Sequence, residues 1–424
     1  MPPVPGIWQG QVFPLSFSDC SFQYSISHLA LANPAFPMYP SVFAAEVFQR
    51  QFGVVAAVGG YAPGRLEFIG NHVDYNGGLV IGATIDKGLQ AAAGRRADGR
   101  VRVFSPAYGA AVEGELAGLA PLSGDAAWAN YPLGVAWALQ KHTGAFPAGF
   151  DLALAGDLPA GAGLSSSAAL ELATAVALRE LFGRSIEPLA LARWCRQAEN
   201  EFVGMPCGLL DQGVSAFGQE DHLVLLDCRA ETFQTLPLPA GARFWVFNTG
   251  AKHALLDSLY ATRRRECEDA LKILRQFYPQ AQYLADLSFA EVEHQRAALT
   301  PDQYARASHV TREIERVRQA VVALERGDLA AVGKLLVASH QSSRELFANS
   351  CPELDFIVDQ LVPLPGVFGA RLTGGGFGGA VMALTSPEFS IKTAAPVLDA
   401  YGRQFGHDVV VFPTRTGAGA HVLL

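Results

Sequence analysis

Residues 156–169 read GDLPAGAGLSSSAA, a run of the small residues from which phosphate-binding loops are built. Gly161 and Gly163 free the backbone where a side chain would obstruct a ligand, and the three serines that follow offer hydroxyl groups. Apolar residues then recur at helical spacing from Leu170 to Leu181. A helix that begins here directs its free N–H groups at the loop, which predicts a site for nucleotide phosphates. The alternative is a flexible turn that happens to precede a helix.

A second set of reactive side chains lies in the polar segment NHVDYNGG, residues 71–78. It brings an imidazole, a carboxylate and amides within a few positions of Arg65. Such donors and acceptors are suited to holding several sugar hydroxyls at once. Strand-like apolar residues flank the segment, and its Asn-Gly step favours a tight reversal. The alternative is an ordinary hairpin with a solvated tip.

Two isolated acidic residues follow the loop. Glu199 lies in a helical pattern, where a lone glutamate is ordinarily a solvated charge. Asp211 follows Leu209 and Leu210, so we expect its carboxylate to lie against apolar surface. Desolvation there would raise the pKa of the carboxyl group and help it to accept a hydroxyl proton. The alternative is a structural or helix-capping aspartate.

The elements that must position these side chains are also visible in the sequence. Alternating apolar residues over 150–154 predict an edge strand just before the glycine- and serine-rich loop. A short amphipathic helix is predicted over 41–52, and two helices over 306–347. Near the C-terminus GGGFGG, residues 374–379, separates two apolar runs and predicts a glycine turn between strands.

With 424 residues, half of them hydrophobic, the chain is long enough for two domains with sizeable cores. It contains no apolar run of about 18 residues and no secretory pattern, so we expect a cytoplasmic protein without a membrane partner. The net charge of −8 includes no basic run, which disfavours a nucleic-acid partner. Six cysteines without a C-x-x-C pair indicate reduced thiols, not a zinc site or disulfides.

Three motifs occur in one order along the chain: GRLEFIGNHVDYNGG (64–78), PAGAGLSSSAALE (159–171) and RLTGGGFGG (371–379). Together they resemble the galactokinase family of the GHMP kinases, and the likeness covers roughly residues 45–424. It implies a mixed α/β (α+β) fold of two domains, one like ribosomal protein S5 and one ferredoxin-like, with the active site in the cleft between them. The domains are expected to be an irregular N-terminal extension (1–40), an N-terminal kinase domain (41–235) and a C-terminal kinase domain (236–424).

The resemblance implies transfer of phosphate from ATP to the C1 hydroxyl of galactose, giving galactose 1-phosphate and ADP, with Mg²⁺ as the metal. In this family Asp211 would orient or deprotonate the hydroxyl, and Arg65 would stabilise the transferring phosphoryl group. The sugar contacts fall on Asn71, His72, Asp74, Gly208, Asp211 and Tyr260. The nucleotide contacts fall on Trp128, Tyr131, Gly161, Gly163, Leu164, Ser165, Ser166, Ser167 and Ala168, with the two aromatic residues near the adenine. Ser167 and Glu199, 32 residues apart as in the family, would hold the metal.

Two positions depart from the galactokinase signature, which usually has Asn where this chain has Glu67 and Glu where it has Asn71. In the family that glutamate accepts a hydrogen bond from the C6 hydroxyl of the sugar. The neutral amide of Asn71 can pair with a hydroxyl and would also tolerate a C6 carboxylate, so galacturonate, N-acetylgalactosamine and related sugars stay open as substrates. A second alternative is a sugar sensor without catalysis. The expected partners are ATP and a monosaccharide, and the expected state is a monomer.

Overall fold

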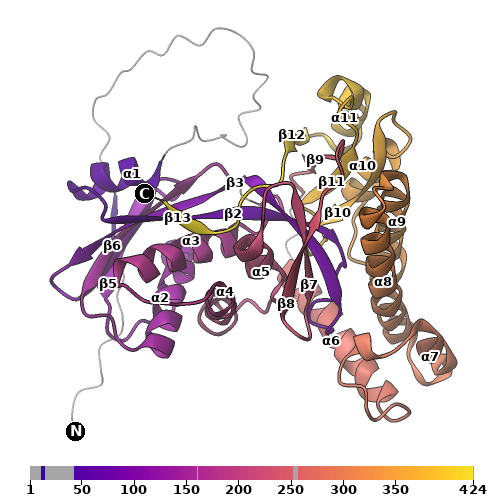
Figure 1. The fold of residues 1–424 in the computed structure, drawn as a ribbon, viewed down its shortest axis with the longest axis horizontal. Helices are drawn as coiled ribbons and strands as arrows, with labels where there is room; N and C mark the ends of the chain where they lie inside the picture. Colours follow the sequence, from indigo (N-terminus) through magenta and orange to yellow (C-terminus); the bar gives the residue numbers. More distant parts are fainter. Residues whose placement is uncertain (1–10, 15–42, 160, 252–255, 424) are drawn as a thin grey trace.

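The computed structural model describes residues 11–14, 43–159, 161–251 and 256–423. Their strands form two sheets, one of nine strands and one of four. Figure 1 shows the larger sheet in the N-terminal part and the smaller one beside it, nearer the yellow C-terminal segments. The expected N-terminal extension lies largely outside the described residues.

The large sheet has the strand order β1-β5-β4-β6-β3-β2-β13, with β7 beside β3 and β8 beside β7. Its strands are β1 (Gln11–Pro14), β2 (Val58–Ile69), β3 (Leu79–Arg96), β4 (Arg100–Ser105), β5 (Ala110–Glu115), β6 (Gly149–Gly156), β7 (His222–Asp227), β8 (Thr232–Pro237) and β13 (His421–Leu423). Its helices are α1 (Ala44–Phe52), α2 (Asn130–Thr143), α3 (Ser166–Leu181), α4 (Pro188–Gln197) and α5 (Leu210–Phe217). Helices α2 to α5 lie below the sheet in the view of Figure 1, and α1 lies above it.

Strand β6, which leads into the serine-rich loop, is a central strand, whereas its alternating pattern predicts an edge strand. It pairs with β3 on one side and β4 on the other, and its first six residues are buried. Phe150, Leu152 and Leu154 contribute to the core under α3, while Ala153 packs in the small cluster under Phe48 of α1. Helices cover both faces, so the small residues between the large ones are buried too.

The small sheet is antiparallel throughout, in the order β10-β11-β9-β12. Its strands are β9 (Arg243–Asn248), β10 (Val367–Thr373), β11 (Ala380–Thr385) and β12 (Val410–Thr414). Its helices are α6 (Leu256–Leu274), α7 (Phe289–His294), α8 (Pro301–Glu325), α9 (Leu329–Ser342), α10 (Pro352–Leu361) and α11 (Ile391–Phe405). The strand order and the β-α-β-β-α-β succession are those of a ferredoxin-like unit. The two helices expected over 306–347 are α8 and α9.

The two sheets share one hydrophobic core. Phe68 of β2 meets Phe244 of β9 edge to face, with ring centres 6.0 Å apart, and both belong to the largest core cluster. The first sheet ends at Pro237 and the second begins at Arg243, but β13 pairs again with β2. His421–Leu423 therefore complete the first sheet after the second sheet has been formed.

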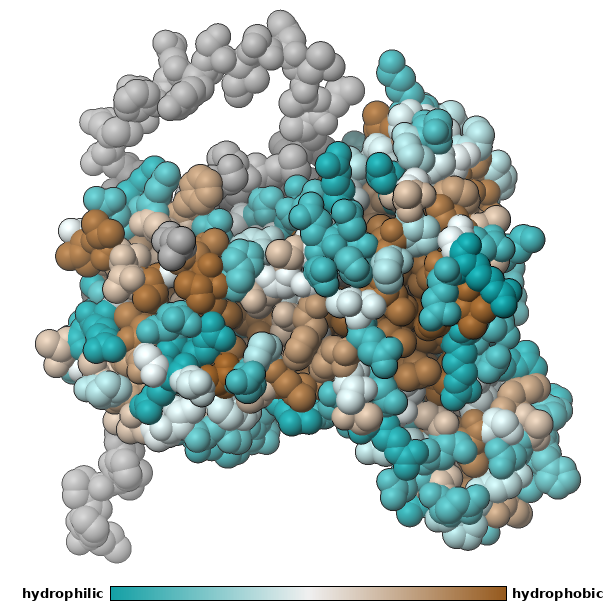
Figure 2. Space-filling view, in the orientation of Figure 1, coloured by the Kyte–Doolittle hydropathy of each residue, from teal (hydrophilic) through white to brown (hydrophobic). Residues whose placement is uncertain are grey.

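The molecular surface is mixed in character. Figure 2 shows hydrophilic residues over much of the periphery of this face and hydrophobic ones nearer its centre. Among the described residues, no helix has the length and apolar character needed to cross a membrane. The five described cysteines, Cys195, Cys207, Cys228, Cys267 and Cys351, are all free thiols, as their spacing predicts.

Candidate active site

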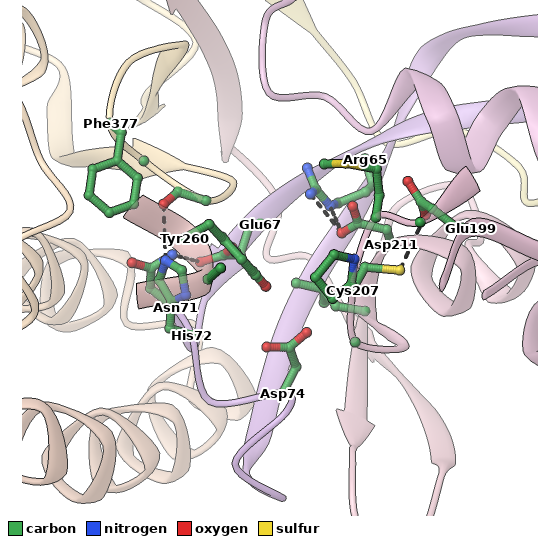
Figure 3. A pocket seen from close by; sticks show the side chains of 18 residues that line it. Arg65, Glu67, Asn71, His72, Asp74, Glu199, Cys207, Asp211, Tyr260 and Phe377 are labelled. Atoms are coloured by element: carbon green, nitrogen blue, oxygen red, sulfur yellow. Dashed lines mark hydrogen bonds and ion pairs between the residues drawn. The ribbon is translucent and has the colours of Figure 1, made fainter. Parts of the chain in front are cut away.

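A cavity of about 560 Å³ lies where the two sheets meet. Figure 3 shows Arg65, Asp211 and Glu199 on one side of it and Glu67, Asn71 and His72 on the other. Its lining residues come from both parts of the chain: Arg65, Glu67, Asn71, His72, Asp74, Glu199, Gly204, Met205, Pro206, Cys207, Gly208, Leu210, Asp211, Tyr260, Ala261, Gly375, Gly376 and Phe377. The volume suits a ligand of the size of a monosaccharide together with part of a nucleotide.

An arginine and a carboxylate face each other in this cavity. Arg65 of β2 donates from Nε to Asp211 Oδ1 at 2.8 Å, and its Nη2 lies 2.6 Å from the same oxygen. Its Nη1 donates to the carbonyl oxygen of Gly163 at 2.7 Å, so one guanidinium connects the carboxylate with the serine-rich loop. Figure 3 shows the pair in the upper part of the cavity. The arrangement places a cation, the Arg65 guanidinium, and a hydrogen-bond acceptor, the Asp211 carboxylate, beside a loop of the phosphate-binding type.

The expected apolar surroundings of the Asp211 carboxylate are not found. Leu209 and Leu210 are buried in the second core cluster, whereas the Asp211 side chain is 25% exposed and pairs with Arg65. Asp211 stands in the first turn of α5, where successive side chains point in different directions. The leucines therefore enter the core while the carboxylate faces the cavity.

The polar segment between β2 and β3 is buried, so the alternative of a solvated hairpin tip is wrong. Asn71, His72 and Asn76 are at most 6% exposed. His72, with a positive φ of 58°, places Nε2 2.9 Å from the carbonyl oxygen of Gly375 and Nδ1 3.0 Å from the Tyr75 hydroxyl. Burial lowers the pKa of His72 to about 3, so the ring is neutral. Both ring nitrogens have protein partners, which makes His72 a fixed part of the cavity wall.

Aromatic rings pack against His72. Phe347 stacks on it with ring centres 4.4 Å apart, and Tyr260 of α6 lies 5.0 Å away. Tyr260 itself lines the cavity. Burial raises the pKa of Tyr260 well above its usual value, so its hydroxyl stays protonated and can donate a hydrogen bond.

Asp74 lines the cavity and lies next to Gly208. A Cβ atom on Gly208 would stand 1.8 Å from Asp74 Oδ2, so only glycine fits this position. Burial raises the pKa of Asp74 to about 7, and the charges of Glu67 and Asp211 add to the effect. Near neutral pH this carboxyl group is thus poised between acceptor and donor.

The serine-rich loop packs against the glycine turn between β10 and β11. The backbones at Gly163 and Gly374 approach each other closely. A Cβ atom on Gly163 would lie 3.1 Å from the Thr373 carbonyl oxygen, and one on Gly374 would lie 3.0 Å from the Gly163 carbonyl oxygen. Ser165 precedes α3 with a positive φ of 53°, and its Oγ is buried without a hydrogen-bond partner among the described residues. An unpaired buried hydroxyl beside a helix N-terminus is a group that a phosphate oxygen would satisfy.

Of the other nucleotide residues predicted from sequence, Gly161, Leu164 and Ser166 to Ala168 lie in the loop or at the start of α3, whereas Trp128 and Tyr131 lie before and in α2. Gly161 has a φ of 71°, the Leu164 carbonyl accepts from the backbone N–H of Arg65 at 3.0 Å, and Ser166, Ser167 and Ala168 form the first turn of α3. Tyr131 lies in the first turn of α2. Trp128 is only 8% exposed, and one of its faces is stacked on Tyr108 with ring centres 4.6 Å apart. Adenine could use that face only by displacing Tyr108.

Known protein families match the same segments. The Galactokinase galactose-binding signature covers residues 46–95, the GHMP kinases N terminal domain 130–219, and the GHMP kinases C terminal domain 320–404. A galactokinase from Pasteurella multocida (strain Pm70) is 37% identical over 374 residues, which are 87% of this chain and 96% of that protein. The galactokinase of Homo sapiens is 37% identical over 366 residues, 85% and 91% of the two chains. The chain belongs to the galactokinase family.

Solved structures agree with this assignment. The crystal structure of Lactococcus lactis galactokinase complexed with galactose superposes with a TM-score of 0.85 at 32% identity, covering 89% of this chain and 98% of that one. A mevalonate kinase at 17% identity, with a TM-score of 0.59, shares the fold alone. The chain therefore has the GHMP kinase fold, and its activity is ATP-dependent phosphoryl transfer to an alcohol group.

A buried acidic cluster in this protein escaped prediction from the sequence. Gln212 donates from Nε2 to Glu171 Oε2 at 3.0 Å and to Glu199 Oε2 at 2.6 Å, and Cys207 donates from Sγ to Glu199 at 3.2 Å. Burial raises the pKa of both glutamates, while a hydrogen bond from Ser167 acts in the opposite direction on Glu199. One signal was available, because Glu171 follows Ser167 by four residues and therefore shares its face of α3.

The raised pKa of Asp74 predicts a pH-dependent stability difference. The group titrates at about 7 in the fold and near 3.8 when unfolded, so the folded protein prefers the protonated carboxyl group. The free energy of unfolding contributed by Asp74 therefore falls as the pH rises from about 4 through 7. Asp74→Asn, neutral at every pH, is expected to gain a few degrees in unfolding temperature relative to the unaltered protein between pH 4.5 and pH 8. Thermal scans across that range, in which the difference between the two proteins stays constant, would contradict the assignment.

Proposed function

We propose that the protein transfers the γ-phosphoryl group of ATP to the C1 hydroxyl of galactose, giving galactose 1-phosphate and ADP. The single observation that carries the proposal is the Arg65 guanidinium, which contacts both Asp211 and the Gly163 carbonyl of the serine-rich loop. A sugar hydroxyl beside Asp211 would then stand next to phosphates held by the loop. The galactose complex of the L. lactis galactokinase supports galactose as the sugar.

In this mechanism Asp211 orients the C1 hydroxyl and accepts its proton as the oxygen attacks the γ-phosphorus. The new bond joins the C1 oxygen to phosphorus, and the bond between phosphorus and the β,γ-bridging oxygen breaks as ADP leaves. Arg65 neutralises charge on the transferring group from a fixed position. Positioning and electrostatics therefore account for most of the rate.

The groups proposed to contact the sugar around this centre are Asp74, Gly208 and Tyr260, while Asn71 and His72, whose polar atoms bond to the protein, would shape the wall of the sugar site. Gly208 would act through its backbone, since a side chain there would collide with Asp74. The proposed nucleotide-holding groups are the loop residues Gly161, Gly163 and Leu164 and the start of α3, Ser165 to Ala168. Trp128 and Tyr131 remain predictions for the adenine.

We further propose Mg²⁺ between Ser167 and Glu199. The donor set fits this metal, because a hydroxyl and a carboxylate are oxygen ligands and Mg²⁺ takes its remaining ligands from phosphates and water. Among the described residues no group of three or more His, Cys, Asp and Glu side chains could form a metal site of their own. Bound there, the cation would supply charge neutralisation for the phosphates, and Gln212 would fix the orientation of the Glu199 carboxylate.

The metal assignment predicts that Glu199→Gln raises the Mg²⁺ concentration needed for half-maximal rate by about tenfold, since an amide is a weaker ligand than a carboxylate. The measurement is ADP release as a function of Mg²⁺. Glu201→Gln serves as the matched control, because Glu201 lies on the same π-helix, Ala198–Val203, and pairs with Lys141 at the surface. Superimposable Mg²⁺ curves for Glu199→Gln and the unaltered protein would count against the assignment.

The proposed reaction is tested by incubating the purified protein with ATP and a panel of monosaccharides that includes galactose, galacturonate and N-acetylgalactosamine. ADP release is recorded, and ³¹P NMR identifies the phosphorylated position. Galactose is expected to be the fastest substrate, with the phosphate on C1. Faster turnover of galacturonate or N-acetylgalactosamine would favour the related-sugar alternative, and sugar binding without ADP release would favour a sensor.

We propose a cytoplasmic monomer as the working form. The five free thiols suit a reducing compartment.

A further inference from the structure

Glu67 and Asn71, the two departures from the galactokinase signature, contact each other. Asn71 donates from Nδ2 to Glu67 Oε1 at 2.8 Å. Compared with the usual signature, the amide and the carboxylate have exchanged places, so the pair as a whole is retained. Both residues line the cavity, which raises the question of which one faces the sugar.

The amide of Asn71 has no bonding capacity left for a ligand. Its Nδ2 also donates to the Gly374 carbonyl at 2.9 Å, so both amide hydrogens are used. Its Oδ1 accepts from Asn349 Nδ2 at 2.8 Å and from Ser343 Oγ at 3.1 Å, so both lone pairs are used. A side-chain amide has two donors and two acceptor sites, and the side chain is fully buried.

Glu67 is held equally firmly but retains a free oxygen. Its Oε1 accepts from both Asn71 and Nη2 of the fully buried Arg371, the latter at 3.1 Å. Arg371 Nη1 also donates to the backbone carbonyls of Glu67 and Phe68. The hydrogen bonds that the described residues make to this carboxylate all go to Oε1, and Glu67 lines the cavity. A carboxylate oxygen without a protein partner on a cavity-lining residue is an acceptor that a ligand or water can satisfy.

We propose that Glu67, and not Asn71, recognises the sugar on this wall, its Oε2 accepting a hydrogen bond from a hydroxyl remote from the one that faces Asp211. Figure 3 places Glu67 beside Asn71, across the cavity from Arg65 and Asp211. Asn71 and Arg371 are then positioning residues that fix the carboxylate. The inference rests on the proposed function, because the Asp211 end defines where the reacting hydroxyl lies.

This assignment changes the expected specificity. A neutral Asn71 at the wall would admit a sugar carboxylate, but Glu67 places a second carboxyl group there. Two carboxylates in a buried site repel each other, so galacturonate is disfavoured and a neutral hydroxyl is selected. The exchange of Glu and Asn in the sequence thus leaves a carboxyl group in the sugar site instead of removing it.

The test compares galactose with 4-deoxygalactose and 6-deoxygalactose, which lack the hydroxyls farthest around the ring from C1. The unaltered protein is expected to favour galactose over one of them by about 10- to 100-fold in kcat/KM, because the missing hydroxyl leaves a buried acceptor unpaired. In Glu67→Gln that ratio is expected to shrink at least fivefold, mainly through a higher KM for galactose. Ratios equal to those of the unaltered protein for both deoxysugars would overturn the inference.

A matched variant separates recognition from support. Asn71→Ser removes the amide but leaves Glu67 in place. It is therefore expected to lower kcat/KM for galactose and for both deoxysugars by similar factors. If Asn71→Ser abolishes the discrimination and Glu67→Gln keeps it, recognition belongs to Asn71. Circular dichroism and thermal unfolding establish that each variant is folded. Should Glu67→Gln fail to fold, Glu67→Asp gives the same test, since it keeps a charge for Arg371 but withdraws Oε2 from the cavity.

Failure of the inference can be told apart from failure of the proposed function. A protein that phosphorylates galactose but shows unchanged ratios in Glu67→Gln refutes the inference alone. A protein that does not phosphorylate galactose refutes the proposed function. In that case calorimetric affinities of the three sugars for the unaltered protein and Glu67→Gln still decide whether Glu67 reads a hydroxyl.

Discussion

Asp211→Asn is expected to lower kcat for galactose phosphorylation by about 10²- to 10⁴-fold, the range that general acid–base catalysis contributes. The amide keeps the shape of the side chain and can still accept from Arg65, but it cannot take the hydroxyl proton. Galactose affinity, measured by calorimetry, is expected to fall far less than kcat. The Arg65 contact and the position in the first turn of α5 are the reasons for placing the base here.

Asp269→Asn is the matched control for this substitution. Asp269 carries the same functional group on an exposed part of α6, where it pairs with Lys272. Its removal should leave kcat unchanged. A kcat for Asp211→Asn within a few-fold of the unaltered value would exclude proton transfer to Asp211 from the rate-limiting chemistry.

Local sequence rules predicted most of the scaffold around this site. Glycine and serine before a helical pattern predicted the loop and α3, and strand-like runs around NHVDYNGG predicted β2 and β3. The order of the strands in the large sheet could not be predicted this way. β6 is central because it pairs with both β3 and β4, and β13 returns to β2 after the second sheet is complete. Both facts depend on contacts between residues far apart in the sequence.

The chemistry of the site was predictable at the level of residue types but not of bonding. The sequence draws attention to Asn71 and His72 as sugar-binding groups, yet both have their polar atoms engaged by the protein. Apart from Glu67 and Tyr75 close by, their partners are Asn349, Ser343 and the glycine turn after β10, about 270 to 300 residues later in the chain. Only the folded structure distinguishes a ligand-binding amide from one that supports the ligand-binding group.

The same distinction applies to the acidic residues. Family spacing singled out Glu199, but nothing in its neighbourhood revealed that Gln212, next to Asp211, would bond to it. The side-chain amide of Gln212 donates to both Glu199 and Glu171, and Gln212 directly follows Asp211, the proposed base, in the sequence. The groups expected to bind the metal and the sugar hydroxyl are thus coupled through two adjacent residues of α5.

Arg65→Met is the second change with a large expected effect, a fall in kcat of about 10²- to 10³-fold, comparable to the loss of one preorganised donor at a developing charge. The guanidinium is 5% exposed and contacts Asp211 and Gly163 together, so methionine can replace its volume but none of its three polar contacts. The KM for ATP is expected to rise less than kcat falls, because the charge on the transferring group grows in the transition state.

The control and the double variant make this prediction specific. Arg318→Met, at a side chain 58% exposed on α8, should leave the rate unchanged. Arg65→Met combined with Asp211→Asn is expected to be little slower than the worse of the two single variants, because groups that act as a unit lose their effect together. Fully multiplicative losses would mean that the two side chains act independently. Their shared hydrogen bond would then be structural, and phosphoryl stabilisation by Arg65 would have to be separated from the proton transfer to Asp211.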